Sequence, residues 1–285
     1  MKKKYLYQHY TWPELGEAVA RQPVVLLPIG SVEDHGHHLP LDVDNFLIWN
    51  ICEKAAEKAE NDILLMPLIP YGFEAHHMDF PGTINVGIEH LYHFVLDITR
   101  SLAHHGFQRI LIADGHGSNM PILDLVARQT IVETGVSCAA FIWPALAAEV
   151  IKSLRESPIP GGMSHACELE TSVYLYLDPD RVQMEKARCD MGQPPSSFIW
   201  LDLMQGSPVR YMDIWSAFSN SGTNGDPTLA NKDKGEKIFN AAVDRLIELV
   251  HEFKSRSRKK PVDHHHYEAD VSTRMSESVR NDDSE

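Results

Sequence analysis

The chain has 285 residues, of which 43% are hydrophobic and 23% are charged, and its formal net charge is −14. This length and composition are typical of a globular protein with a sizeable core, and no apolar run reaches the roughly 18 residues that a membrane-spanning helix needs. The acidic balance argues against a nucleic-acid partner, because such a partner requires a basic face.

Segments typical of strands and of helices alternate along the chain. Short apolar runs bounded by turn residues predict strands at residues 24–29, 63–69, 110–113 and 136–143. Longer segments with helical spacing predict helices at residues 46–59, 88–103, 120–133 and 168–177. Asp44 and Asn45 are candidate caps for the first of these helices. This alternation predicts an α/β fold with a mainly parallel central sheet.

The last predicted helix begins at Asp226-Pro227, a cap residue followed by proline, and runs to about Lys254. We find no repeat and no linker before it, so residues 1–255 are expected to form a single domain. Residues 256–285 are polar and are expected to form a flexible tail. We interpret His264-His265-His266 in this tail as an exposed cluster outside any active site.

The four cysteines are scattered and include no CxxC pair, so the sequence indicates neither a zinc finger nor a disulfide framework. The start, Met1-Lys2-Lys3-Lys4, is positively charged. The apolar segment and cleavage site of a signal peptide do not follow it. We therefore expect a cytoplasmic protein.

Metal-type ligands follow two of the predicted strands. Glu33 and His35 come just after residues 24–29, and side chains two residues apart point to the same side of an extended segment. Asp44 lies nine residues beyond His35, after a turn that contains Pro40, and can fold back. His116 follows residues 110–113. Because ligands bind beyond the carboxyl ends of parallel strands, these four side chains are expected to share one cleft.

Carboxylates and imidazoles together suit a divalent ion such as zinc, manganese or iron. One carboxylate can bridge two ions, and two ions lower the pKa of a shared water enough to make hydroxide near neutral pH. The alternative is a histidine-rich polar surface loop.

A third segment places His165 three and five residues before Glu168 and Glu170, at the start of an apolar helix. Buried glutamates are costly unless a cation or hydrogen bonds compensate them. The alternative is that the dipole of the helix favours both carboxylates at its N-terminus. The residues alone leave both interpretations open.

The chain resembles the creatininase (creatinine amidohydrolase) superfamily in five blocks, in order from about residue 20 to about residue 240. The blocks are residues 30–41 with Asp44, Phe80-Pro81-Gly82-Thr83, Asp114-Gly115-His116-Gly117-Ser118-Asn119, residues 165–172 and residues 222–227.

The resemblance implies a three-layer α/β/α sandwich with a dinuclear metal centre. In family terms Glu33 and His116 hold one divalent ion, His35 holds the other, and Asp44 bridges them. His165 matches the catalytic histidine that handles protons. Zinc is the expected metal, with manganese or iron as alternatives, and the assembly implied is a homohexamer.

This sequence departs from creatininase at Ser118, where creatininase has a glutamate that serves the second metal. Glu170 is our candidate replacement, and Glu168 is the weaker one. His77, in a loop that resembles one near the family's substrate, is a candidate substrate-binding residue, and Glu168 is a second.

The implied activity is hydrolysis of a small cyclic amide or another non-peptide C–N bond by metal-bound hydroxide. One alternative is a hydrolase that opens a cyclic keto-inositol at a carbon–carbon bond. Another is a metal-binding structural subunit without catalysis. We expect a small-molecule substrate, with neither nucleic acid nor membrane as a partner.

Overall fold

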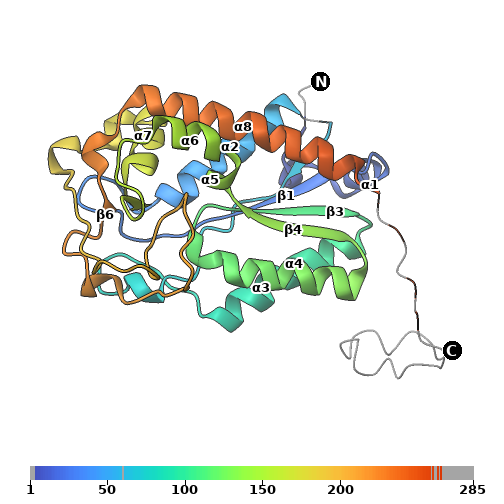
Figure 1. The fold of residues 1–285 in the computed structure, drawn as a ribbon. Coiled ribbons are helices and arrows are strands. Elements are labelled where there is room, and N and C mark those ends of the chain that lie inside the picture. The colour runs from blue at the N-terminus through green and yellow to red at the C-terminus, as the bar shows by residue number, and fades with distance from the viewer. Residues whose placement is uncertain (1–3, 60, 258, 260–261, 263, 265–285) are drawn as a thin grey trace.

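A parallel sheet forms the centre of the protein. The computed structural model describes residues 4–59, 61–257, 259, 262 and 264. The four parallel strands lie in the order β2-β1-β3-β4 between two layers of helices (Figure 1). They are β1 (Val24–Ile29), β2 (Ile63–Leu65), β3 (Arg109–Asp114) and β4 (Ser137–Ile142). The predicted three-layer α/β/α arrangement with a mainly parallel sheet is confirmed.

The two helical layers follow from the alternation of side chains along the strands. Val24 and Leu26 of β1 pack into the core on one face, and Val25 and Leu27 pack into the core on the other. The first face is covered by α2 (Val43–Lys58), α5 (Trp143–Leu146), α6 (Ala148–Leu154), α7 (Glu168–Leu177) and α8 (Lys232–Ser255). The second is covered by α1 (Trp12–Ala20), α3 (Ile88–His104) and α4 (Met120–Thr134).

Strand β2 ends at Leu65, so the strand predicted for residues 63–69 is too long. The N–H of Met66 donates to the carbonyl of Leu26, but Pro28 has no N–H with which to continue the ladder toward β2. The chain rejoins β1 only at Ile69, whose N–H donates to the carbonyl of Pro28 at 3.0 Å. The missing N–H of Pro28 therefore explains the early end of the ladder.

Two helix starts differ from the prediction. Pro227 opens only a short 3-10 turn, Pro227–Leu229, and α8 begins at Lys232 with Asn231 as its cap. Ala230 and Asn231 are extended, which separates the two elements. Helix α2 begins at Val43, so Asp44 lies inside its first turn and is not its cap.

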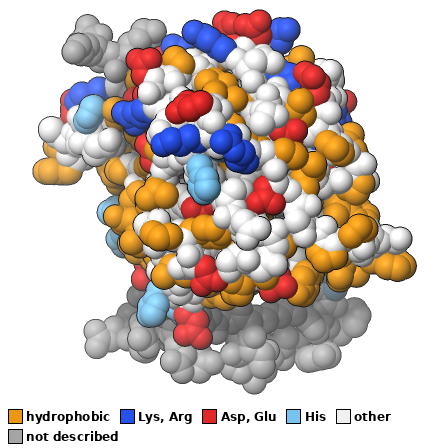
Figure 2. All heavy atoms as spheres, turned by 90° about the vertical axis from the view of Figure 1, so that its left-hand side faces the viewer, with side chains coloured by type: hydrophobic (Ala, Val, Ile, Leu, Met, Phe, Trp, Pro, Cys, Tyr) orange, Lys and Arg blue, Asp and Glu red, His pale blue; other side chains and the backbone are white. Residues whose placement is uncertain are grey.

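A long connection lies over the carboxyl ends of the strands. It runs from α7 to α8, on the left of Figure 1, and includes β6 (Asn224–Gly225), which pairs with β5 (Met163–His165) in a small antiparallel sheet. Figure 2 shows this side of the protein, where hydrophobic side chains are interspersed with acidic and basic ones. Among the described residues no helix is both long and apolar enough to cross a membrane. Most of the predicted tail, with His265 and His266, lies outside the described residues.

Candidate metal centre

Two glycines position the start of α2 against the sheet. Gly30 follows β1 and Gly115 follows β3. A Cβ atom on Gly115 would lie 2.5 Å from the carbonyl oxygen of Asp44, and one on Gly30 would lie 2.9 Å from the backbone nitrogen of Asn45. Only glycine allows such a close approach. The first turn of α2 is thereby fixed over the ends of both strands, and Asp44 enters the crevice between them.

The Asp44 carboxylate lies between two imidazoles. Its Oδ1 is 3.4 Å from Nε2 of His35, and its Oδ2 is 3.1 Å from Nδ1 of His116. Oε1 of Glu33 is 2.9 Å from the same Nδ1 of His116. All four side chains are buried. The structure therefore brings together the four residues that the strand pattern placed in one cleft, with Asp44 in the middle.

Glu170 joins this cluster from α7. Its ligand atom lies within 4.8 Å of one on His35 and one on His165. Glu33, His35 and Asp44 form a second such group, as do Glu33, His77 and His165. The donors are carboxylate oxygens and imidazole nitrogens, which suit zinc or manganese.

Several of these buried atoms have no hydrogen bond. Neither carboxylate oxygen of Glu33 has a partner of correct geometry in the described part of the chain, and the same is true of Nε2 of His35. Short separations without aligned hydrogen bonds are expected of atoms arranged around a common cation. The residues present therefore fit a group of divalent ions.

Charges in the cluster show why a cation would be favourable. Burial raises the pKa of Glu33 well above its ordinary value, and the Glu74 carboxylate raises it further. Burial also opposes ionisation of Asp44, but His35 and then His116 hold the pKa of Asp44 well below its ordinary value. Burial would lower the pKa of His35, yet Asp44 and then Glu170 raise it to about 9. Without a metal, protonated imidazoles balance the carboxylates; divalent ions would replace those protons.

His165 is held in one orientation by the loop after β1. Its Nε2 donates to the backbone carbonyl of Asp34 at 2.7 Å, so this nitrogen carries the proton of the neutral ring. Its Nδ1 lies 3.7 Å from Oε1 of Glu33 and faces the cluster. A neutral His165 therefore presents an unprotonated nitrogen to the centre.

His77 lies beside His165, and both of its ring nitrogens face carboxylates. Its Nδ1 donates to Oδ1 of Asp34 at 2.7 Å, and its Nε2 is 3.6 Å from Oε2 of Glu33. Trp215 stacks on its ring, with the ring centroids 4.5 Å apart and the planes at 27°. The substrate-binding role of His77 stays a prediction, since both of its nitrogens face carboxylates.

The structure places Glu168 outside this cluster, and its candidate roles stay predictions. Its carboxylate accepts hydrogen bonds from the backbone nitrogens of Glu156 and Ser157 and pairs with Lys234 of α8 at 2.5 Å. Successive helical residues are about 100° apart, so positions 168 and 170 point to nearly opposite sides of α7. Glu170 faces the centre, and Glu168 therefore faces α8.

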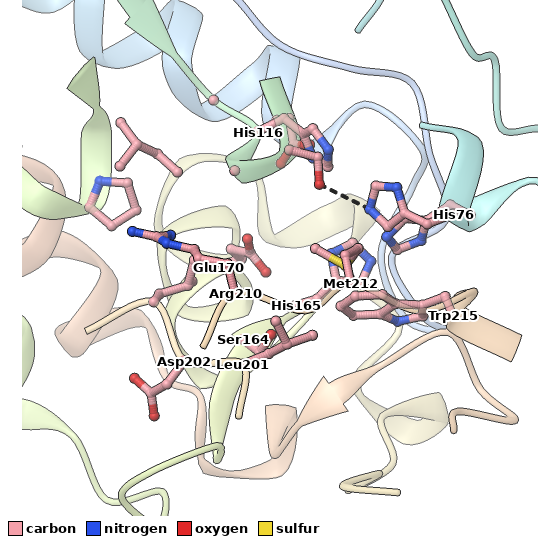
Figure 3. Close-up of a pocket in the computed structure, with 18 residues that line it drawn as sticks. His76, His116, Ser164, His165, Glu170, Leu201, Asp202, Arg210, Met212 and Trp215 are labelled. Carbon is pink, nitrogen blue, oxygen red and sulfur yellow. Dashed lines mark hydrogen bonds and ion pairs between the residues drawn. The ribbon is translucent and has the colours of Figure 1, made fainter. Parts of the chain in front are cut away.

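Sequence reasoning missed Glu74 and His76, which precede His77 in the loop after β2. Oε2 of Glu74 lies 3.0 Å from Nε2 of His116, and Nε2 of His76 lies 3.0 Å from the hydroxyl of Ser118 (dashed line in Figure 3). The signal was the concentration of acids and histidines before the proline–glycine turn. Nothing in the local pattern, however, showed which of them turn inward.

A cavity of about 190 Å³ opens onto the cluster. Figure 3 shows His116, Glu170 and His165 around it, with Trp215 and Met212 from the long connection forming one wall. Ile142, Pro144, Leu201 and Leu203 add apolar lining. The arrangement is a small pocket with apolar walls beside a set of metal-type donors, as expected for a small-molecule site.

Comparison with known proteins finds similarity over most of the chain. The family model of creatininase, described as creatinine amidohydrolase, matches residues 8–250. The mycofactocin precursor peptide peptidase of Mycolicibacterium smegmatis is 30% identical over 254 residues, which cover 84% of this chain and 93% of the relative. The creatinine amidohydrolase of Pseudomonas putida is 29% identical over 267 residues, which cover 88% of this chain and 98% of the relative.

The fold matches as well. A solved structure of a mutant creatininase of the Zn-Zn type superposes with a TM-score of 0.74 at 26% identity, covering 90% of this chain and 100% of that one. The sequence match, the shared fold and the buried donors at the strand ends agree with one another. The chain belongs to the creatininase family of metal-dependent hydrolases.

Proposed function

We propose that the protein is a dinuclear metal-dependent hydrolase that cleaves an amide-type C–N bond in a small substrate. The observation that carries this proposal is the position of Asp44, whose two oxygens face His35 and His116 separately. Glu33 and His116 would hold one ion, and His35 and Glu170 the other, with Asp44 shared. The Zn-Zn type of a solved relative supports zinc as the metal.

When bound, two such ions lower the pKa of a water and polarise a carbonyl. The protein's own residues do the rest. His165, fixed by its bond to the Asp34 carbonyl, can take a proton at Nδ1 and return it to the leaving nitrogen. Apolar side chains of the pocket would pack against a bound substrate, and Trp215, stacked on His77, is one of them.

A cavity of about 190 Å³ favours a small cyclic amide or another compact C–N substrate. A short peptide is the second candidate, because one relative is named as a peptidase of a peptide precursor. The alternative is the ring opening of a cyclic keto-inositol. It would use the same activated water but would break a carbon–carbon bond.

A substrate panel tests the proposal. Zinc-loaded protein would be incubated with lactams including creatinine, formamides, short peptides and keto-inositols, and products would be read by mass. We expect addition of water to an amide, with about two metal ions bound per chain. Opening of keto-inositols alone would contradict the amide assignment. Metal-loaded protein that hydrolyses none of the four classes would contradict the proposal as a whole.

The wall of the pocket supports a further expectation about the substrate. Asp202 and Arg210 both line the pocket (Figure 3). Asp202 is neutralised by Arg155, whose guanidinium binds both of its oxygens at 2.7 and 2.9 Å. Within the described ranges no acidic side chain forms an ion pair with Arg210. The exposed guanidinium of Arg210 is therefore available to a carboxylate on the substrate.

Changing Arg210 to glutamine is therefore expected to raise KM for a carboxylate substrate about 10-fold and to leave its neutral counterpart unchanged. The pair N-formylglycine and N-formylglycinamide differs in that group alone, so steady-state kinetics on both would isolate the effect. Arg128→Gln, on the exposed surface of α4, is the matched control. Equal changes in KM for both compounds would show that Arg210 does not read the carboxylate.

A further inference from the structure

Glu74 is a buried carboxylate that the proposed mechanism does not use. Its side chain is 0% exposed, and neither of its oxygens has a hydrogen-bond partner of correct geometry among the described residues. Its backbone nitrogen donates to Oδ1 of Asn85 at 2.8 Å, which fixes the loop but gives the carboxylate no hydrogen bond. A buried carboxylate without a hydrogen bond is costly, so its position calls for a physical explanation.

His116 supplies that explanation because its two ring nitrogens face different groups. Nδ1 is turned toward Glu33 and Asp44, at 2.9 and 3.1 Å. Nε2 is turned toward Glu74, at 3.0 Å from Oε2. A neutral imidazole has one unprotonated nitrogen, so a ring that gives Nδ1 to a metal must carry its proton on Nε2. Glu74 is the acceptor within reach of that proton.

We infer that Glu74 is a positioning residue, which accepts the Nε2 proton of His116 and holds Nδ1 toward the metal centre. The inference rests on the proposed function. Histidines that bind metals commonly donate their second N–H to a carboxylate, which fixes the tautomer and the ring orientation. The present contact has the distance of a hydrogen bond but not its alignment.

A third metal ion is the competing explanation, since ligand atoms of Glu74, His76 and His116 lie within 4.8 Å of one another. One argument favours positioning. Nε2 of His116 would have to lose its proton and bind a cation while Nδ1 binds another, which a neutral imidazole cannot do. Nε2 of His76 is bonded to the hydroxyl of Ser118, so only Nδ1 of that ring is without a hydrogen bond.

The test is the zinc affinity of the full chain, measured by competition with a chelator of known affinity. Glu74→Ala is expected to weaken the tighter-bound zinc about 10- to 100-fold. Glu74→Gln keeps an oxygen that can accept the Nε2 proton, so its affinity is expected to stay close to that of the wild type. Glu89→Gln, an exposed change on α3, controls for loss of a negative charge.

The outcomes separate this inference from the proposed function. If the wild type binds two ions and Glu74→Ala binds them as tightly, the role of Glu74 is wrong while the dinuclear centre stands. If Glu74→Gln binds zinc as weakly as Glu74→Ala, the affinity depends on the charge of Glu74 and not on the hydrogen bond. That result would overturn the positioning role. Three ions in the wild type and two in Glu74→Ala would identify a third site instead. A wild type that binds no zinc would overturn both proposals.

Discussion

Changing Asp44 to asparagine is expected to leave at most one metal ion per chain and to reduce turnover about 10³-fold. Oδ1 of Asp44 faces His35 at 3.4 Å and Oδ2 faces His116 at 3.1 Å, so the carboxylate is placed to serve both of the proposed ions. An amide has a single oxygen that can bind a cation. Loss of one ion removes several kcal/mol of transition-state stabilisation, and about 4 kcal/mol corresponds to this factor. Elemental analysis and the rate on a panel substrate measure both effects.

Asp42→Asn is the matched control for Asp44. Asp42 caps the same helix, two residues earlier, but its carboxylate accepts a hydrogen bond from the hydroxyl of Tyr174 at 2.9 Å and lies outside the cluster. We expect this variant to keep both ions and near-normal turnover. An Asp44→Asn protein with two ions and the wild-type rate would show that the carboxylate does not bridge them.

The second large effect is expected at His165. His165→Ala should keep both ions but reduce turnover about 10²- to 10⁴-fold, the usual range for a group that transfers protons. The bond from its Nε2 to the Asp34 carbonyl leaves Nδ1 facing the centre, 3.7 Å from Glu33. His116→Ala should behave differently and lose metal, since the Nδ1 of His116 touches both Glu33 and Asp44.

Metal content and turnover are therefore measured on the same preparations. His37→Ala is the control, because His37 is an exposed histidine in the loop after β1, whose Asp34 carbonyl binds His165. Full activity of His165→Ala on the substrate found in the panel would rule out its role as the proton carrier. Loss of metal from that variant would instead make His165 a ligand, which its place beside His35 and Glu170 permits.

Much of the site was predictable from local patterns. Apolar runs followed at once by glycine and by ligand residues indicated strand ends, and the carboxyl ends of parallel strands meet at one edge of a sheet. Glu33, His35, Asp44 and His116 lie together for this reason. Gly30 and Gly115 mark the same strand ends, since the packing of Asp44 and Asn45 leaves no space for a side chain at either position.

Other features depended on residues far apart in the sequence. The length of β2 was limited by Pro28 on the neighbouring strand, and periodicity within one segment does not reveal the effect of a residue on another. The choice between Glu168 and Glu170 depended on the side of α7 that packs on α8, where Lys234 pairs with a carboxylate. The sequence could not decide which glutamate faces the cluster, because both lie in the first turn of the same helix.

By itself, the sequence determined the order of elements, the parallel sheet and the four candidate ligand positions at its edge, because hydrophobic periodicity and turn residues act over short range. Only the tertiary structure decided that Glu74 and Arg210 reach the same region, since each comes from a loop without periodicity. Loop side chains are placed by what they pack against, and those partners can lie far away in the sequence, as His116 does from Glu74.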